Sequence, residues 1–254
     1  MARMLEGTVA LVTGASSGNG EATARKLAEL GAAVAVVARR KERLDALVSE
    51  IGKVGGKASA IEADITCSLL AVAAVEQTVG RFGRLDILIN NAGLMLIGPT
   101  VGADPHDWDR MTQININGLL YMTNAALPHL IAAAESGPRN VADLVNVSSV
   151  AAFQVNAINS VYAMTKVAVN GFSESLRQEV TRRHVRVGVI EPGSVATELA
   201  SHNKQEIQDK VLSPYFKEIE TLVPDDIAEA IAYMVTRPRR AAVGKMWIGP
   251  TEQV

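Results

Sequence analysis

The stretch TVALVTGASSGNGE, residues 8–21, decides the expected fold of this chain. Residues 8–13 are mostly β-branched and apolar, as in a buried strand, and they lead directly into Gly14, Gly18 and Gly20 and a helical pattern. Glycine lets a backbone turn sharply and approach a diphosphate without a Cβ in the way, and free N–H groups at a helix start attract that anion. The spacing G-x-x-x-G-x-G differs from the common G-x-G-x-x-G, so an ordinary strand-to-helix turn is the alternative interpretation.

Short apolar runs alternate with longer helical patterns along the rest of the chain. We predict further strands at 33–38, 85–90, 144–147 and 185–191, and helices at 21–30, 41–54, 69–82, 162–180 and 224–236. This alternation, with right-handed crossovers, predicts an α/β fold: one doubly wound parallel sheet with helices on both faces. Because there is no linker or repeat, we expect a single domain over residues 1–254, in which the polar stretch 194–222, called here the lid segment, is a mobile lid.

Composition excludes several classes of protein. The 254 residues include 25 Lys+Arg and 27 Asp+Glu, a net charge of -2 that argues against a nucleic-acid partner. The apolar runs fall far short of the roughly 18 residues of a membrane span, and the N-terminus has no signal-peptide pattern, so we expect a cytoplasmic protein. Cys67 is the one cysteine, so a thiolate metal cluster is excluded. No metal site is expected either from the four histidines, which lack ligand spacing: His106, His129, His184 and His202.

The end of the second expected strand points to the nucleotide. NAD-binding proteins usually have an acidic residue there to hold the ribose hydroxyls, but this chain has Arg39, Arg40 and Lys41. Three cations at a helix start oppose the helix dipole unless an anion is bound. The 2′-phosphate of NADP is such an anion, and Arg39 can bind it with two hydrogen bonds. A solvated run of surface charge is the alternative, but the pattern favours NADP(H) as cofactor.

A second constellation carries chemistry. Tyr162 and Lys166 are four residues apart in YAMTK and share one helix face. A phenol has a reference pKa near 10, and a neighbouring ammonium group favours its charged form. Ser149 lies 13 residues before Tyr162, at the end of an expected strand, where α/β sheets present ligand-binding residues.

These motifs together resemble the classical short-chain dehydrogenase/reductase (SDR) family. The segments TGASSGNG, NNAG at 90–93, NVSS, YAMTK and the pair Pro192 and Gly193 occur in the family's order. The resemblance implies a Rossmann-type fold of seven parallel strands, nicotinamide-dependent hydride transfer and a homotetramer, or a homodimer. It assigns Tyr162 as the general acid or base, Lys166 as the residue that lowers its pKa and holds the nicotinamide ribose, and Ser149 as the group that orients the carbonyl. Asn115, three residues before Gly118, matches the asparagine that anchors a water linking the lysine to solvent.

The resemblance also implies the cofactor contacts. Asp64 matches the acid that binds adenine and Thr197 the threonine that bonds the carboxamide, although a helix cap and a plain surface threonine are the alternatives. Asn90 belongs to the segment that shapes the adenosine side of the cleft. With the two arginines, the expected contacts are Gly14, Ser16, Ser17, Asn19, Gly20, Arg39, Arg40, Asp64, Ile65, Asn91, Ala92, Gly93, Tyr162, Lys166, Pro192, Gly193, Val195 and Thr197.

Two features depart from the family pattern. Asn19 occupies a position that is nearly always isoleucine, and a buried amide there needs hydrogen-bond partners or costs about 1–3 kcal/mol. The C-terminus reads KMWIGPTEQV, where many members have a strand followed by Gly-Gly. This ending and several internal segments look most like the branch that contains clavulanate-aldehyde reductase and relatives acting on small hydroxy acids.

The expected substrate site lies between segments 94–97 and 150–159 and the lid segment. Met95 and Phe153 offer apolar surface, and Gln154 and Asn156 offer amides. His202, when the lid closes, can meet a carboxylate, although a solvated histidine is the alternative. The amides favour a small polar substrate.

We therefore predict an NADP(H)-dependent enzyme that reduces a small polar aldehyde or ketone and reversibly oxidises the alcohol. Three alternatives are open: an NADP(H)-sensing protein without catalysis, which would typically lack the tyrosine or lysine, an NAD-dependent alcohol dehydrogenase, and an epimerase or dehydratase with tightly held NAD. Met164, Val167 and Phe172 give the helix at 162–180 more apolar surface than one stripe, as expected for a helix at a subunit interface.

Overall fold

Seven parallel strands form the centre of the protein in this computed structural model, which describes residues 4–253. The strands are β1 (Val9–Thr13), β2 (Ala33–Ala38), β3 (Lys57–Glu62), β4 (Ile87–Asn90), β5 (Ala142–Val147), β6 (Val185–Pro192) and β7 (Lys245–Ile248). They lie side by side in the order β3-β2-β1-β4-β5-β6-β7, and every pair is parallel. The predicted doubly wound α/β sheet is therefore confirmed. Residues 1–3 and 254 of the predicted domain lie outside the described residues.

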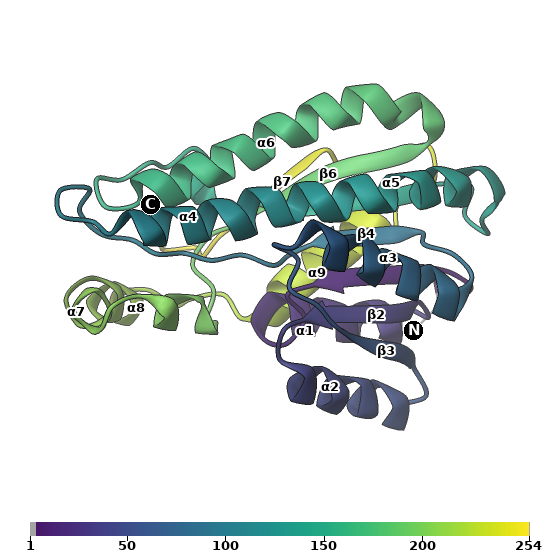
Figure 1. Ribbon diagram of the computed structural model, residues 1–254, viewed down its shortest axis with the longest axis horizontal. Coiled ribbons are helices and arrows are strands. Elements are labelled where there is room, and N and C mark those ends of the chain that lie inside the picture. Colours follow the sequence, from purple (N-terminus) through teal and green to yellow (C-terminus); the bar gives the residue numbers. More distant parts are fainter. Residues whose placement is uncertain (1–3, 254) are drawn as a thin grey trace.

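Helices cover both faces of this sheet (Figure 1). One layer contains α1 (Gly18–Glu29), α2 (Lys41–Lys53) and α9 (Pro224–Val235), and the other contains α3 (Ser68–Phe82), α5 (Leu119–Ser136) and α6 (Ser160–Val180). Before α5 come α4 (Pro105–Thr112) and a π-helical turn, η1 (Gln113–Gly118). No helix within residues 4–253 combines the length and the apolar character needed to cross a membrane.

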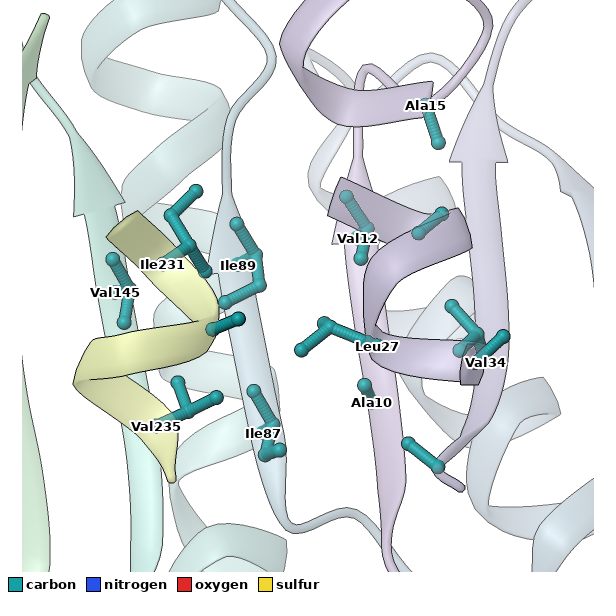
Figure 2. Packing of buried hydrophobic residues seen from close by; sticks show 14 of the residues in the cluster. Ala10, Val12, Ala15, Leu27, Val34, Ile87, Ile89, Val145, Ile231 and Val235 are labelled. Atoms are coloured by element: carbon teal, nitrogen blue, oxygen red, sulfur yellow. The ribbon is translucent and has the colours of Figure 1, made fainter. Parts of the chain in front are cut away.

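The core follows from the alternation of side chains along each strand. In β1, Ala10 and Val12 pack against the layer of α1 and α9, while Val9 and Leu11 pack against the opposite layer. Figure 2 shows the first of these interfaces, where Leu27 of α1 and Ile231 of α9 lie over the strands. Both faces of the central strands are buried, which is why their sequences are nearly continuous in apolar residues.

The lid segment contains short helical elements that its sequence pattern did not predict. These are η4 (Glu198–His202), α7 (Gln205–Ile207), η5 (Gln208–Leu212) and α8 (Ser213–Glu218), and α7 and α8 lie at one end of the molecule in Figure 1. The two ends of the segment are joined, because Ala196 donates to the Leu222 carbonyl at 2.8 Å and Leu222 donates to the Ser194 carbonyl at 3.0 Å. The lid segment therefore leaves and rejoins the body of the protein at one place.

Candidate active site

A cleft of about 890 Å³ opens at the carboxyl ends of the strands. The strands β1 and β4 are neighbours, but the chain continues from β1 to one face of the sheet and from β4 to the other. The connections therefore diverge at this point, where open α/β sheets bind ligands. All the predicted cofactor contacts except Gly20 line this cleft, together with Ser149 and four of the five predicted substrate residues. One continuous site thus contains nearly all of the residues predicted from the sequence.

The glycine loop between β1 and α1 packs directly on the segment after β4. Gly14 has a φ of +65°, and a Cβ on it would lie 2.8 Å from the Cα of Ala92. A Cβ on Gly20 would lie 2.5 Å from the Gly14 carbonyl oxygen, so Gly20 closes the loop from beneath and does not line the cleft. Thr13 Oγ1 accepts hydrogen bonds from the amides of Asn91 and Ala92, both at 3.0 Å. This close backbone arrangement fits a diphosphate at the start of α1.

Asn19, the departure from the family pattern, lines the same loop. Its Oδ1 atom is buried and has no hydrogen-bond partner among the described residues. The amide was expected to need hydrogen-bond partners, and its oxygen is an unsatisfied acceptor in the cleft wall. A dinucleotide carries ribose hydroxyl donors of the kind that satisfy such an atom.

Arginine side chains lie at the end of the cleft that is expected to hold the adenosine, called here the adenosine end. Arg40 Nε donates to Ser16 Oγ at 3.1 Å, and Arg40 Nη2 donates to Ser16 Oγ at 2.9 Å and Ser17 Oγ at 2.8 Å. Arg39 also lines the cleft. Asp64 lines it nearby, and its Oδ1 accepts from Thr66 N and Thr66 Oγ1 at 3.0 and 2.7 Å, which is a turn rather than a helix cap because α3 begins at Ser68. The guanidinium groups and serine hydroxyls together fit a phosphate.

Tyr162, Ser149 and Lys166 meet at the other end of the cleft. Tyr162 stands in the first turn of α6 and is 6% exposed, and Lys166 follows one turn later with its Nζ 5.7 Å from the Tyr162 ring centre. Lys166 Nζ donates to the Val147 carbonyl at 2.9 Å, which fixes the ammonium group against the end of β5. Ser149 begins the turn after β5, and its Oγ accepts from the Ala151 amide at 3.1 Å.

Burial is the largest influence on the pKa values of Tyr162 and Lys166. Burial raises the pKa of Tyr162 above its ordinary value, and hydrogen bonding to Ser149 lowers it by less. The pKa of Tyr162 is therefore shifted upward, whereas the sequence predicted that Lys166 would lower it. The reason is that the loss of solvation outweighs the hydrogen bond. A phenol with a raised pKa keeps its proton at neutral pH, as a general acid must. Burial also lowers the pKa of Lys166 to about 8, so its ammonium form still predominates at pH 7.

Asn115 lies behind this group rather than in the cleft. It belongs to the π-helical turn η1, a helix distortion that often occurs at functional sites. Its Oδ1 accepts from the Leu94 amide at 2.8 Å, and its Nδ2 donates to the Leu94 carbonyl at 2.9 Å and to Thr165 Oγ1 at 3.1 Å. The side chain therefore fixes the start of the loop after β4 and links it to α6. Its predicted role in anchoring a water stays a prediction.

The loop after β6 closes the nicotinamide end of the predicted site. Gly193 leaves no room for a side chain, since a Cβ would lie 2.9 Å from the Cα of Gly249. Thr197 packs against Gly18, whose Cβ would lie 3.1 Å from Thr197 Cγ2. Pro192, Val195 and Thr197 all line the cleft, so Thr197 is not a plain surface residue.

The predicted substrate residues need one correction. Met95, Gln154, Asn156 and His202 line the cleft, but Phe153 lies outside it. Phe153 is 48% exposed and packs edge-on against Trp247 of β7, with 6.3 Å between the ring centres. The apolar ring turns toward another apolar surface on β7, a contact that the local sequence does not reveal.

Asn203 is a residue that the sequence analysis missed. It is 5% exposed, its Oδ1 accepts from the Ile97 amide at 2.8 Å, and its Nδ2 donates to the Met95 carbonyl at 3.0 Å. It thereby ties the lid segment to the loop after β4. Its only signal in the sequence was its position beside His202 in a polar stretch, where an asparagine usually faces solvent.

Within the described residues there is no group of three or more metal-binding side chains that could hold a metal ion.

Comparisons with known proteins agree with this geometry. A family pattern described as short chain dehydrogenase matches residues 8–208. An uncharacterised oxidoreductase of Staphylococcus saprophyticus is 36% identical over 249 residues, which are 96% of each chain. Among solved structures, a serine dehydrogenase in complex with NADP+ is 32% identical with a TM-score of 0.85, covering 97% of this chain and 96% of the other. A 3-ketoacyl-(acyl-carrier-protein) reductase from Brucella melitensis in complex with NADH is 30% identical with a TM-score of 0.86, covering 98% and 100%.

Proposed function

Because the chain belongs to the short-chain dehydrogenase family of oxidoreductases, we propose that it reduces the carbonyl group of a small polar aldehyde or ketone with NADPH. The reverse reaction oxidises the corresponding alcohol. The observation that carries the proposal is the union of two groups in one cleft: the glycine loop with Arg40 at one end, and Tyr162 with Ser149 and Lys166 at the other. A bound nicotinamide supplies the hydride for reduction and accepts it in oxidation.

The protein's own residues handle the substrate oxygen and its proton. Tyr162 donates its phenolic proton to the carbonyl oxygen as negative charge develops there. Ser149 offers a second hydroxyl that orients the same oxygen. Lys166, held by the Val147 carbonyl, contributes a positive charge beside the phenol and stabilises the phenolate that remains. In oxidation the phenolate takes the proton back from the alcohol.

The preference for NADP(H) is supported by the cations at the adenosine end. A dianionic phosphate is recognised well by a guanidinium group with neighbouring hydroxyl donors, and Arg40, Ser16 and Ser17 are arranged in this way. The similar serine dehydrogenase binds NADP+ and the similar reductase binds NADH, so fold likeness alone does not select a cofactor. The arginines are therefore the residues on which the preference depends.

A small polar substrate fits the other end of the cleft. Gln154 and Asn156 line it with amides, and His202 lines it from the lid segment. Burial, followed by the charge of Arg40, lowers the pKa of His202, so at neutral pH it is an uncharged hydrogen-bond donor. This lining is compatible with a hydroxy acid or the matching oxo acid, as for the similar serine dehydrogenase, and with the branch that contains clavulanate-aldehyde reductase.

A panel of small aldehydes, ketones and oxo acids, assayed separately with NADPH and NADH by the absorbance of the reduced nicotinamide, tests the proposal. Turnover of a polar member with a higher kcat/KM for NADPH is the expected result. NADPH binding without turnover of any carbonyl or alcohol would indicate a sensing protein. Cofactor that co-purifies without net turnover would indicate an epimerase or dehydratase, and a preference for NAD would indicate an NAD-dependent alcohol dehydrogenase.

The proposal includes self-association through α6. Met164 and Val167 are 52% and 49% exposed on this helix, whereas Phe172 packs partly against the core. Pairing α6 with its copy in a homodimer or homotetramer removes these two apolar side chains from water. Light scattering on Met164→Lys with Val167→Lys is expected to give a smaller assembly than the unchanged protein.

A further inference from the structure

A carboxylate of the lid segment lies on the arginines of the adenosine end. Glu198 Oε2 accepts from Arg40 Nη1 at 2.8 Å, and Glu198 Oε1 accepts from Arg43 Nη1 at 2.6 Å. Hydrogen bonds from Arg43 and Arg40 lower the pKa of Glu198 to about 2, so its side chain is ionised at neutral pH. Glu198 therefore neutralises the cationic start of α2, which the sequence analysis found unfavourable unless an anion is present.

The contact joins two parts of the site that are far apart in sequence. Arg40 immediately precedes α2, and Glu198 is the first residue of η4, directly after Thr197. Arg40, Thr197 and Glu198 all line the cleft. The same guanidinium group that donates to Ser16 and Ser17 therefore also holds the beginning of the lid segment.

We propose that Glu198 is a specificity-determining residue: in the cofactor-free enzyme its carboxylate occupies the Arg40 guanidinium group that receives the 2′-phosphate, so NADP(H) must displace it whereas NAD(H) need not. The inference rests on the proposed use of NADP(H). It assigns to the lid segment an internal anion that reduces the advantage of the phosphorylated cofactor.

The energetics favour exchange over a permanent pair. The side chains of Glu198, Arg40 and Arg43 are each between 42% and 49% exposed, and ion pairs at such sites are weak and screened by salt. A phosphate dianion carries more charge and more acceptor atoms than a carboxylate, so it competes well for the same donors. A carboxylate left beside that phosphate repels it, which makes displacement of Glu198 more favourable than sharing of Arg40.

Displacement also affects the lid segment. Once Glu198 leaves the arginines, η4 loses its attachment to the start of α2, while Asn203 still bonds to the loop after β4. The 2′-phosphate thereby changes the constraint on the element that follows Thr197. NAD(H), which lacks this phosphate, leaves the attachment in place.

Calorimetric dissociation constants of NADPH and NADH for Glu198→Gln test the inference without measuring turnover. Glutamine keeps the size of the side chain and removes its charge. We expect NADPH to bind about three- to tenfold more tightly than to the unchanged enzyme, with NADH unaffected, because two exposed ion pairs no longer compete. The fragment 2′,5′-ADP is expected to gain as much as NADPH. Glu206→Gln is the matched control, since Glu206 pairs with Lys210 at 2.8 Å inside the lid segment and away from these arginines.

Two other results overturn the inference. Unchanged binding of NADPH to Glu198→Gln shows that the carboxylate does not compete, and weaker binding of both dinucleotides shows that Glu198 instead closes over a bound cofactor. Arg40→Ala separates this failure from failure of the proposed cofactor. If Arg40→Ala leaves the ratio of NADPH to NADH affinity unchanged, Arg40 does not receive the 2′-phosphate, so its part in the proposed cofactor site fails and this inference fails with it. If that ratio falls while Glu198→Gln does not raise it, only the inference fails.

Discussion

Asn203 accepts a hydrogen bond from the Ile97 amide at 2.8 Å, and this contact connects the lid segment to the loop after β4. Asn115 fixes the beginning of that loop through both backbone groups of Leu94. Two asparagines from distant parts of the chain therefore hold the stretch 94–97 of this loop, one at each end of the stretch. The wall of the substrate end is thus built on buried side-chain amides, whose loss leaves backbone groups without partners.

Asn203→Ala is expected to loosen the lid segment. The variant leaves the Ile97 amide and the Met95 carbonyl without their partner, a cost of about 1–3 kcal/mol if they stay buried and less if local opening exposes them to water. We expect the KM for the carbonyl substrate to rise more than the dissociation constant of NADPH. Faster amide hydrogen exchange over residues 198–212 is the direct measurement.

Gln205→Ala is the control for that experiment. Gln205 lies two residues away on the lid segment, and its Nε2 donates to Asp209 at 2.8 Å on the exposed surface. Its removal is expected to change neither KM nor exchange. Equal effects of the two variants would mean that the lid segment responds to any substitution, and would remove the role given to Asn203.

Tyr162→Phe is expected to abolish proton transfer while cofactor binding remains. The change removes one hydroxyl from a buried ring that otherwise stays in place. General acid–base catalysis contributes about 10²–10⁴-fold to the rate, so kcat is expected to fall at least about 10²-fold. NADPH affinity, measured by calorimetry, is expected to change by less than about threefold, because the glycine loop and the arginines are unaffected. A variant that keeps most of its turnover would contradict the role of Tyr162.

The central strands were predictable because a strand that is buried on both faces needs apolar residues at nearly every position. β1, β2 and β4 are nearly continuous in apolar residues, and helices cover both of their faces. β3 and β7 lack such a run: their burial is only partial, since they are the two edges of the sheet. Only the resemblance to a seven-stranded family implied them. α5 was missed for another reason, because its apolar residues surround the helix and include Pro128.

The site was predictable where backbone geometry or local spacing defines it. Gly14 and Gly20 leave no room for a Cβ, and Tyr162 and Lys166 are one helical turn apart. The contacts of Asn203 and Glu198 depend instead on how the lid segment packs on residues about a hundred or more positions away. No local pattern specifies such contacts, so both residues appeared as ordinary polar positions.

Asn19→Ile is expected to stabilise the cofactor-free protein. Asn19 Oδ1 is buried without a partner among the described residues, and the desolvation of such an acceptor costs about 1–3 kcal/mol. An apolar side chain removes this cost, so we expect the free energy of unfolding to rise by about 1 kcal/mol. A higher midpoint of urea unfolding with an unchanged m-value is the measurement. Asn124→Ile, the same change at an exposed position, is expected to give no gain, and equal gains at both sites would refute the explanation.

The pH dependence of reduction is expected to report Lys166. Burial lowers the pKa of this lysine to about 8, so its positive charge is present below that pH and is lost as the pH rises through it. The pKa of Tyr162 is raised above its ordinary value, and that of His202 is lowered, so neither titrates near pH 8. We therefore expect kcat/KM for the carbonyl, measured from about pH 6 to pH 10, to fall on the alkaline side with an apparent pKa near 8. Lys166→Arg keeps its charge throughout this range, so its activity, although reduced by the altered geometry, is expected to lose this alkaline fall. The same fall in both proteins would assign it to another group.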